Sequence, residues 1–302
     1  STNTIHTRLT PMTDTTTPKS LQQIHTATGR HWVGDGFPVS TVFAYTDLGR
    51  DLNPFIMLDY AAPYVFEPTE RRRGVGEHPH RGFETVTVVY DGHLEHRDSS
   101  GGGGTIGPGD VQWMTAGAGI VHEEMHTDAF ARAGGTMRMA QLWVNLPAEL
   151  KRTPPGYQTI LASTIPTAAI AGGALRVIAG EYAGIRGPAK TFTPMNVCDV
   201  RLDAGADTAL DLPSGWTAAL FVMEGQVEMA DGRALGAGQL GIFSRDGSRI
   251  ALRCDGPVQA LLLAAEPIDE PMVGYGPFVM NTREEIVEAF RDYEAGRMGR
   301  LA

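Results

Sequence analysis

Six of the nine histidines of the chain lie between residues 78 and 126, whereas residues 127–302 contain none. Two of the six form the sequence His78-Pro79-His80. On an extended strand, side chains two residues apart point to the same face, so both imidazoles can converge on one point. A metal site built on imidazole is therefore expected in the first half of the chain and excluded from the second.

The sequence His122-Glu123-Glu124 repeats this spacing with one imidazole and one carboxylate. We expect His122 and Glu124 to share a face and Glu123 to point away from it. If the two segments meet across a small β-barrel, three imidazoles and one carboxylate surround one point. Such a donor set suits a divalent first-row transition metal with open positions for water or substrate. Structural zinc more often binds thiolates and closes its fourth position.

The remaining polar residues of this region are weaker candidates. His93 and His96 are three residues apart, so on a strand they face opposite sides and cannot chelate as a pair. Both are expected on the surface. Glu84 has the same parity as His80, but the strand can break between them, which ranks Glu84 second to Glu124 as the carboxylate.

Short strands and turns must position these side chains. The 302 residues include 37 glycines and 19 prolines, which is typical of many turns and does not suit long helices. Segment 84–96 contains a β-branched run, Asp91-Gly92 and a second alternating run, a pattern that predicts a β-hairpin. The run Gly101–Gly104 lacks a following Lys-Ser/Thr and a helical pattern, so it predicts a flexible hairpin loop rather than a phosphate cradle.

A weak internal repeat indicates two related β-domains in tandem. Segments 90–98 and 223–231 share a turn of an acidic residue and glycine, then an apolar residue, a glutamate and a closing aspartate. Prolines place the boundary between residues 147 and 166. The predicted organisation is a flexible N-terminal extension at 1–24, a metal-binding barrel at 25–146, a linker at 147–166 and a second barrel with the terminal helix at 167–302.

One amphipathic helix is predicted near the C-terminus. Thr282 followed by Glu285 forms a capping box, and Ile286, Phe290 and Tyr293 then recur at helical spacing. We expect this helix to pack on the outside of a β-domain.

The composition indicates which classes of partner the protein can bind and in which cellular compartment it is expected. A net charge of −10 argues against direct nucleic-acid binding, which needs a basic face, though not against a basic protein partner. The only cysteines, Cys198 and Cys254, cannot form a disulfide scaffold, fit a reducing compartment and are expected to be buried and inert. No apolar stretch approaches 18 residues and no secretory signal is apparent, so no membrane span is expected and the cytoplasm is the expected location.

Several longer motifs resemble the pirin family. They fall between about residues 25 and 299, and comprise Arg72–Gly76 leading into HPHRGFETVT (78–87), GPGDVQWMTAGAGIVHEEM (107–125), LWVNLP (142–147) and GPFVMNT (276–282). The resemblance implies an all-β bicupin, with two tandem cupin barrels of the double-stranded β-helix or jelly-roll type. It places a metal in the first barrel and a degenerate second barrel after it, and the helix predicted from the capping box follows at the C-terminus.

The resemblance also implies the chemistry of the site. The family's metal ligands correspond to His78, His80, His122 and Glu124. Family members typically hold Fe(II), and Mn, Ni, Cu or Zn also accept such donors. Several act as quercetin 2,3-dioxygenases, which open a flavonol ring with O₂ and release carbon monoxide. Nuclear members instead act as iron-dependent binding partners of transcription factors.

The sequence therefore predicts a metal-dependent dioxygenase acting on O₂ and a small aromatic substrate, a quercetin-like flavonol or related aromatic enol. The metal would lower the pKa of the flavonol hydroxyl, and Glu124 would be the catalytic residue that takes its proton, provided that it loosens from the metal when the substrate arrives. Phe83, Trp113 and Met114 either flank the flat substrate or form plain core. The alternatives are an iron-dependent, redox-sensing regulator that binds a protein partner, and a metal-stabilised barrel without chemistry.

Overall fold

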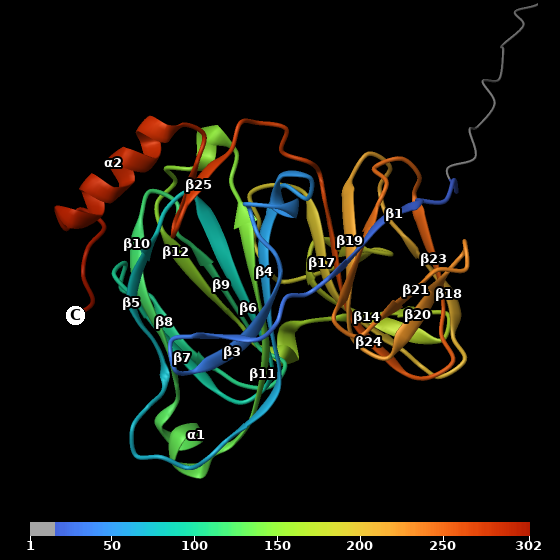
Figure 1. Cartoon of the computed structure of the whole chain (residues 1–302), viewed down its shortest axis with the longest axis horizontal. Coiled ribbons are helices and arrows are strands. Elements are labelled where there is room, and N and C mark those ends of the chain that lie inside the picture. The colour runs from blue at the N-terminus through green and yellow to red at the C-terminus, as the bar shows by residue number, and fades with distance from the viewer. Residues whose placement is uncertain (1–15) are drawn as a thin grey trace, which may run out of the picture.

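The computed structural model describes residues 16–302, so most of the predicted extension at 1–24 lies outside the described residues. Strands dominate the described part, and its only α-helices are α1 (Asp128–Ala133) and α2 (Arg283–Glu294). The strands form two β-barrels that lie side by side, the first mostly blue to green and the second mostly yellow to orange (Figure 1). The prediction of an all-β protein with a helix near the C-terminus is confirmed.

The first barrel consists of a seven-stranded and a four-stranded antiparallel sheet. The larger sheet has the order β12-β9-β6-β11-β4-β3-β2 and the smaller has the order β5-β10-β7-β8. Its strands are β2 (His31–Val33), β3 (Phe37–Phe43), β4 (Phe55–Phe66), β5 (Gly74–His80), β6 (Phe83–Asp91), β7 (Leu94–Asp98), β8 (Gly103–Ile106), β9 (Val111–Thr115), β10 (Ile120–His126), β11 (Gly135–Asn145) and β12 (Gly156–Ile160).

The second barrel repeats this architecture, as the internal repeat predicted. Its seven-stranded sheet has the order β1-β22-β19-β24-β17-β14-β13, and its four-stranded sheet has the order β18-β23-β20-β21. Its strands are β1 (Leu21–Thr26), β13 (Thr167–Ile170), β14 (Gly173–Ala179), β17 (Met195–Leu202), β18 (Asp207–Asp211), β19 (Thr217–Glu224), β20 (Gln226–Met229), β21 (Ala234–Gly236), β22 (Gln239–Phe243), β23 (Arg249–Arg253) and β24 (Val258–Ala265). The remaining elements are β15 (Glu181–Tyr182), β16 (Ile185–Arg186), β25 (Val273–Tyr275), β26 (Phe278–Met280) and the short 3₁₀ helices Leu48–Arg50, Ala148–Leu150 and Ala162–Thr164.

The prediction of a hairpin at 84–96 is wrong, because the two strands do not pair with each other, although the predicted turn is present. Gly92 has a φ of 95°, the left-handed conformation that favours glycine. The flanking strands β6 and β7 nevertheless belong to different sheets, so the chain crosses from one face of the barrel to the other. The hairpin loop expected at Gly101–Gly104 is present but shorter, because Gly103 and Gly104 already belong to β8, which pairs antiparallel with β7.

The two seven-stranded sheets pack against each other through a shared apolar core. Val86 and Trp113 of the first barrel belong to the same buried cluster as Phe221 and Leu263 of the second. Trp113 is thus a core residue between the barrels. Of the two roles expected for it, flanking the substrate or forming core, the structure gives it the second. The side chains of β6 that alternate with Val86, among them Thr87, face the interior of the first barrel.

Both ends of the described chain cross to the opposite barrel. Strand β1 pairs with β22 of the second barrel, so residues 21–24 form a strand within the stretch expected to be a flexible extension. At the other end, the segment containing β25, β26 and α2 lies against β5 and β10 of the first barrel (Figure 1). The expected linker at 147–166 likewise contains β12, which pairs with β9 of the first barrel. Such long-range pairings leave no mark in local sequence patterns.

Helix α2 begins as the capping box predicted. Thr282 is its N-cap and accepts a hydrogen bond from the backbone N–H of Glu285 (3.2 Å). Ile286 and Ala289 are buried together with Val121 of β10, which fixes the helix on the first barrel. No helix of residues 16–302 is long and apolar enough to cross a membrane.

Candidate metal centre

Strands β5 and β10 bring the two predicted histidine segments together. They pair antiparallel with His78 opposite His122 and His80 opposite Ile120. One ring nitrogen from each of His78, His80 and His122 lies within 4.8 Å of those of the other two. The ring centroids of His78 and His122 are 4.3 Å apart, and those of His80 and His122 are 5.0 Å apart. His80 and His122 are buried, and His78 is half-buried.

Hydrogen bonds at Nδ1 leave the other ring nitrogen of each histidine available. The Nδ1 of His78 lies 2.7 Å from the carbonyl oxygen of Gly76, and that of His80 lies 3.2 Å from the carbonyl oxygen of Pro277. A carbonyl oxygen only accepts, so each of these Nδ1 atoms carries a proton, and the neutral form of each ring then has its lone pair on Nε2. The Nε2 of His122 is buried with no hydrogen-bond partner among the described residues.

These three imidazoles fit a transition-metal ion. Burial, followed by the neighbouring charge of His78, lowers the pKa of His80 to about 3. The same two causes, in the same order, hold the pKa of His122 well below its ordinary value. Neutral imidazole is the form that ligates metals. The orphaned Nε2 of His122 is the buried polar atom that such an ion would satisfy.

The Glu124 carboxylate is buried on β10 but lies outside the cluster of three histidine nitrogens. Both of its oxygens accept hydrogen bonds from Gln141 Nε2 (3.1 Å each), and Oε1 also accepts one from Thr87 Oγ1 (3.3 Å). Its role as a fourth ligand therefore stays a prediction. Glu123 pairs with Arg97 instead (2.7 Å), so it points away from the interior as expected.

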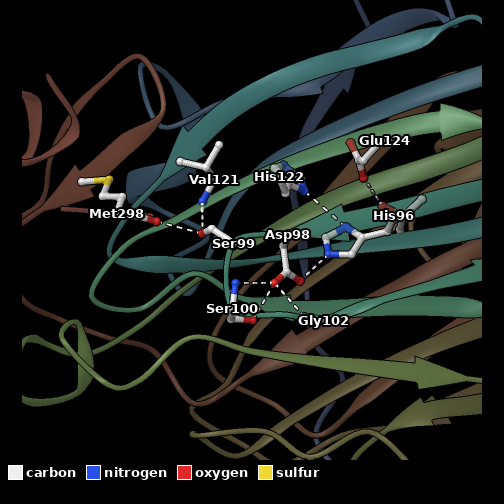
Figure 2. A network of polar contacts seen from close by, with 10 residues as sticks. His96, Asp98, Ser99, Ser100, Gly102, Val121, His122, Glu124 and Met298 are labelled. Atoms are coloured by element: carbon white, nitrogen blue, oxygen red, sulfur yellow. Dashed lines mark hydrogen bonds and ion pairs between the residues drawn. The ribbon is translucent and has the colours of Figure 1, made fainter. Parts of the chain in front are cut away.

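The expectation that both His93 and His96 lie on the surface is wrong for His96. His93 is exposed, whereas His96 is only 1% exposed and lies beside the histidine cluster. Figure 2 shows His96 on β7 between His122 and Asp98. The available signal was the His-x-Asp spacing of His96 and Asp98, which places both on one face of a strand.

Glu84 and Phe83 sit on opposite sides of β6. Glu84 is fully buried, accepts a hydrogen bond from Thr115 Oγ1 (2.6 Å) and shares the face of Val86 toward the second barrel. Burial raises the pKa of Glu84 to about 7. Phe83 stacks on Trp143 with ring centroids 4.3 Å apart, and its ring lies 5.2 Å from that of His80. Glu84 therefore does not face the histidines, whereas Phe83 packs behind one of them.

Met114 belongs to a small apolar cluster with Ala116, Ile120 and, at its edge, Tyr157. Its side chain is 1% exposed. The structure thus gives Met114 the core role of the two alternatives.

Family models match both barrels of the chain. The model described as Pirin matches residues 36–144, and the model described as Pirin C-terminal cupin domain matches residues 197–299. A Pseudomonas aeruginosa protein named "Putative quercetin 2,3-dioxygenase PA2418" is 53% identical over 92% of this chain and 98% of its own length. The chain belongs to the pirin family.

Other pirin relatives extend this comparison. A pirin-like protein of Solanum lycopersicum is 39% identical over 88% of each chain. A crystal structure of quercetin 2,3-dioxygenase from Acinetobacter baumannii is 50% identical and superimposes with a TM-score of 0.92, covering 94% of this pirin-family chain and all of the other. The nickel(II) complex of the Escherichia coli pirin YhhW shares the fold with a TM-score of 0.62 at 21% identity, over 82% of this chain and 99% of the other. The bicupin architecture expected from the sequence motifs is confirmed.

Proposed function

We propose that this pirin-family protein is a metal-dependent dioxygenase that cleaves quercetin-like flavonols with O₂. The observation that carries the proposal is the convergence of three imidazoles, each with its Nδ1 in a hydrogen bond, inside the first barrel. The names of two similar proteins support it, since both are called quercetin 2,3-dioxygenases, one of them with the qualifier "Putative".

Fe(II) is the ion proposed for this centre, held by His78, His80 and His122, with Glu124 as the fourth ligand. Mn, Ni, Cu and Zn accept the same donors, so the loaded ion has to be controlled in any assay. When bound, the ion supplies a Lewis acid for the flavonol 3-hydroxyl and a redox centre for O₂.

Glu124 is the proposed general base. Its Oε1 accepts hydrogen bonds from both Thr87 and Gln141, whereas its Oε2 accepts one from Gln141 alone. Oε2 therefore has more free lone-pair capacity, and it would take the proton of the flavonol 3-hydroxyl, which requires that Glu124 loosens from the metal when the substrate arrives. Gln141 orients the carboxylate for this transfer because its Nε2 contacts both oxygens.

The Phe83–Trp143 stack closes the site behind His80 and limits access of water from that side. Phe83 is fully buried and Trp143 is partly buried, and the ring of Tyr45 stacks on that of Trp143 with centroids 6.3 Å apart. An apolar wall of this kind favours a flat aromatic substrate over a polar one.

Oxygen uptake and carbon monoxide release test the proposal. The apo chain is loaded with Fe(II) under anaerobic conditions and mixed with quercetin and O₂. We expect turnover by the wild-type protein and none by His80→Ala, which lacks a buried ligand. His93→Ala, which removes an exposed histidine of the same barrel, should keep the wild-type rate. Folded, iron-loaded wild-type protein that consumes no O₂ with quercetin overturns the proposal.

A further inference from the structure

His96 and Asp98 form a buried chain of contacts behind the metal centre. The Nδ1 of His96 lies 3.4 Å from the Nδ1 of His122, and the Nε2 of His96 lies 2.6 Å from Asp98 Oδ2. His96 stacks face to face on Tyr157, with ring centroids 4.3 Å apart and planes 10° apart. Strand β7 places Asp98 opposite His122 and His96 opposite Glu124, so both side chains join the face that carries the site (Figure 2).

The hydrogen-bond partners of Asp98 fix its orientation. Its Oδ1 accepts hydrogen bonds from the Ser100 backbone N–H (2.8 Å), the Ser100 hydroxyl (2.5 Å) and the Gly102 backbone N–H (3.1 Å). Its Oδ2 faces His96. Because a carboxylate only accepts, His96 carries its proton on Nε2 and donates it to Asp98.

This arrangement determines the proton position on His122. In a neutral His96 ring the proton on Nε2 leaves Nδ1 with only a lone pair, and the facing Nδ1 of His122 must then donate to it. The His122 Nε2 is then unprotonated, and it is the nitrogen left without a partner among the described residues. His78 and His80 are fixed by backbone carbonyls, whereas His122 depends on side chains.

We propose that His96 and Asp98 are positioning residues that hold His122 in the Nδ1–H tautomer, with its Nε2 lone pair directed at the metal centre. The proposal rests on the metal-binding part of the proposed function. A partner behind a ligating histidine fixes its ring and raises its basicity, and losing such a partner typically weakens metal binding about 10–100-fold.

Asp98→Asn tests the proton position with almost no change in shape. Three donors surround Oδ1, so the amide oxygen of the variant stays there and its NH₂ group faces His96 Nε2. The His96 proton then moves to Nδ1, where it opposes the Nδ1–H of His122. His122 relieves this conflict by carrying its proton on Nε2, which blocks the ligand position.

The affinity of the apo chain for nickel(II), measured by competition with a chelator, is the first readout. We expect Asp98→Asn and His96→Phe to bind nickel(II) about 10–100-fold more weakly than wild type. His96→Phe keeps a ring to stack on Tyr157 but lacks the acceptor. His96→Asn, whose side-chain oxygen can occupy the position of Nδ1, should bind more tightly than His96→Phe. The controls Asp207→Asn and His93→Phe change exposed residues and should leave the affinity unchanged.

The second readout uses neither metal nor turnover. Nitrogen NMR of the histidine rings in the apo protein should show His122 protonated on Nδ1 in wild type and on Nε2 in Asp98→Asn. Wild-type nickel affinity in both Asp98→Asn and His96→Phe, or an unchanged His122 tautomer in Asp98→Asn, overturns the proposal. If His96→Phe fails to fold, the nearly isosteric Asp98→Asn decides. A wild-type chain that binds nickel(II) but does not consume O₂ with quercetin refutes flavonol cleavage and leaves this proposal standing.

Discussion

The Nδ1 of His80 lies 3.2 Å from the carbonyl oxygen of Pro277, a residue 197 positions later in the chain. Pro277 sits in the turn between β25 and β26, the segment that returns from the second barrel to cover the first. Directly after His80, the carbonyl oxygen of Arg81 accepts a hydrogen bond from the Val279 backbone N–H (3.2 Å). The C-terminal segment therefore lines the candidate metal centre, and substitutions in this segment should alter the position of His80.

Arg81→Ala should destabilise the fold and weaken metal binding. The Arg81 guanidinium is nearly buried and pairs with Asp292 of α2 (2.8 Å), and its Nε donates to the carbonyl oxygen of Ala118 (2.7 Å). Breaking a buried ion pair costs about 3 kcal/mol in the free energy of unfolding. Loosening α2 also loosens the Pro277 carbonyl that orients His80. Denaturant unfolding and nickel(II) affinity measure the two effects.

Arg152→Ala is the control for Arg81→Ala, because Arg152 also forms an ion pair with a carboxylate of α2. Arg152 pairs with Glu288 of α2 at 2.9 Å, but both side chains are about half exposed. An exposed pair contributes less than about 1 kcal/mol, so this variant should behave like wild type in both measurements. Equal losses from the two substitutions would contradict the importance assigned to the Arg81–Asp292 pair.

Metal binding should stabilise the folded chain. An ion that binds the native state alone adds about 2.7 kcal/mol to the free energy of unfolding when its free concentration is 100 times the Kd. We expect nickel(II) to raise the melting temperature of the apo protein and a chelator to reverse the rise. His122→Ala should lose this response, whereas His31→Ala, an exposed histidine of β2, should keep it. If nickel(II) raised the melting temperatures of both variants equally, the ion would bind elsewhere on the protein.

The three clustered histidines and the terminal helix were accessible from sequence because both signals are local. The His-x-His and His-x-Glu spacings need only the alternation of a strand, and Thr282 with Glu285 needs only one helical turn. Each can be read without knowing which elements are neighbours in space.

The residues that the sequence analysis misplaced depend on pairings between distant strands. His96 is buried because β7 pairs with β10, and its spacing from His93 hides its proper partner, Asp98. The Asp91-Gly92 turn is real, but a local turn signal does not report that β6 and β7 enter different sheets. The crossing of β1 to β22 has no local signal either.

Gln141→Leu should separate orientation of Glu124 from metal binding. Gln141 Nε2 contacts both carboxylate oxygens, so its loss leaves Glu124 with only the hydrogen bond from Thr87 to Oε1 and weakens the control of its orientation. We expect kcat for quercetin to fall about 10-fold or more, because a misplaced base loses part of the usual 10²–10⁴-fold contribution of proton transfer. The nickel(II) affinity should change less, since the three histidines remain. Gln226→Leu, an exposed position of β20, serves as the control, and a larger effect on affinity than on kcat would contradict this role.

Glu84→Gln should stabilise the protein at alkaline pH and leave its stability unchanged near pH 4.5. Burial raises the pKa of Glu84 to about 7 in the folded state, against 4.5 for a glutamate exposed to water. Between these values the folded chain holds a proton that the unfolded chain has released, so the free energy of unfolding of wild type falls as pH rises. The fall amounts to about 3 kcal/mol by pH 8, since one pKa unit corresponds to about 1.4 kcal/mol.

Glutamine carries no charge at any pH, and its side-chain oxygen can still accept the hydrogen bond of Thr115, so Glu84→Gln lacks this loss. Denaturant unfolding of both proteins from pH 4.5 to 8 should therefore give curves that start together and diverge, with the variant more stable. Glu228→Gln, half exposed on β20, should not diverge from wild type in this range. Parallel curves for Glu84→Gln and wild type would mean that Glu84 is ionised in the folded protein. The hydrogen bonds of the Thr115 hydroxyl and the Trp113 indole would then stabilise the carboxylate by more than its burial costs.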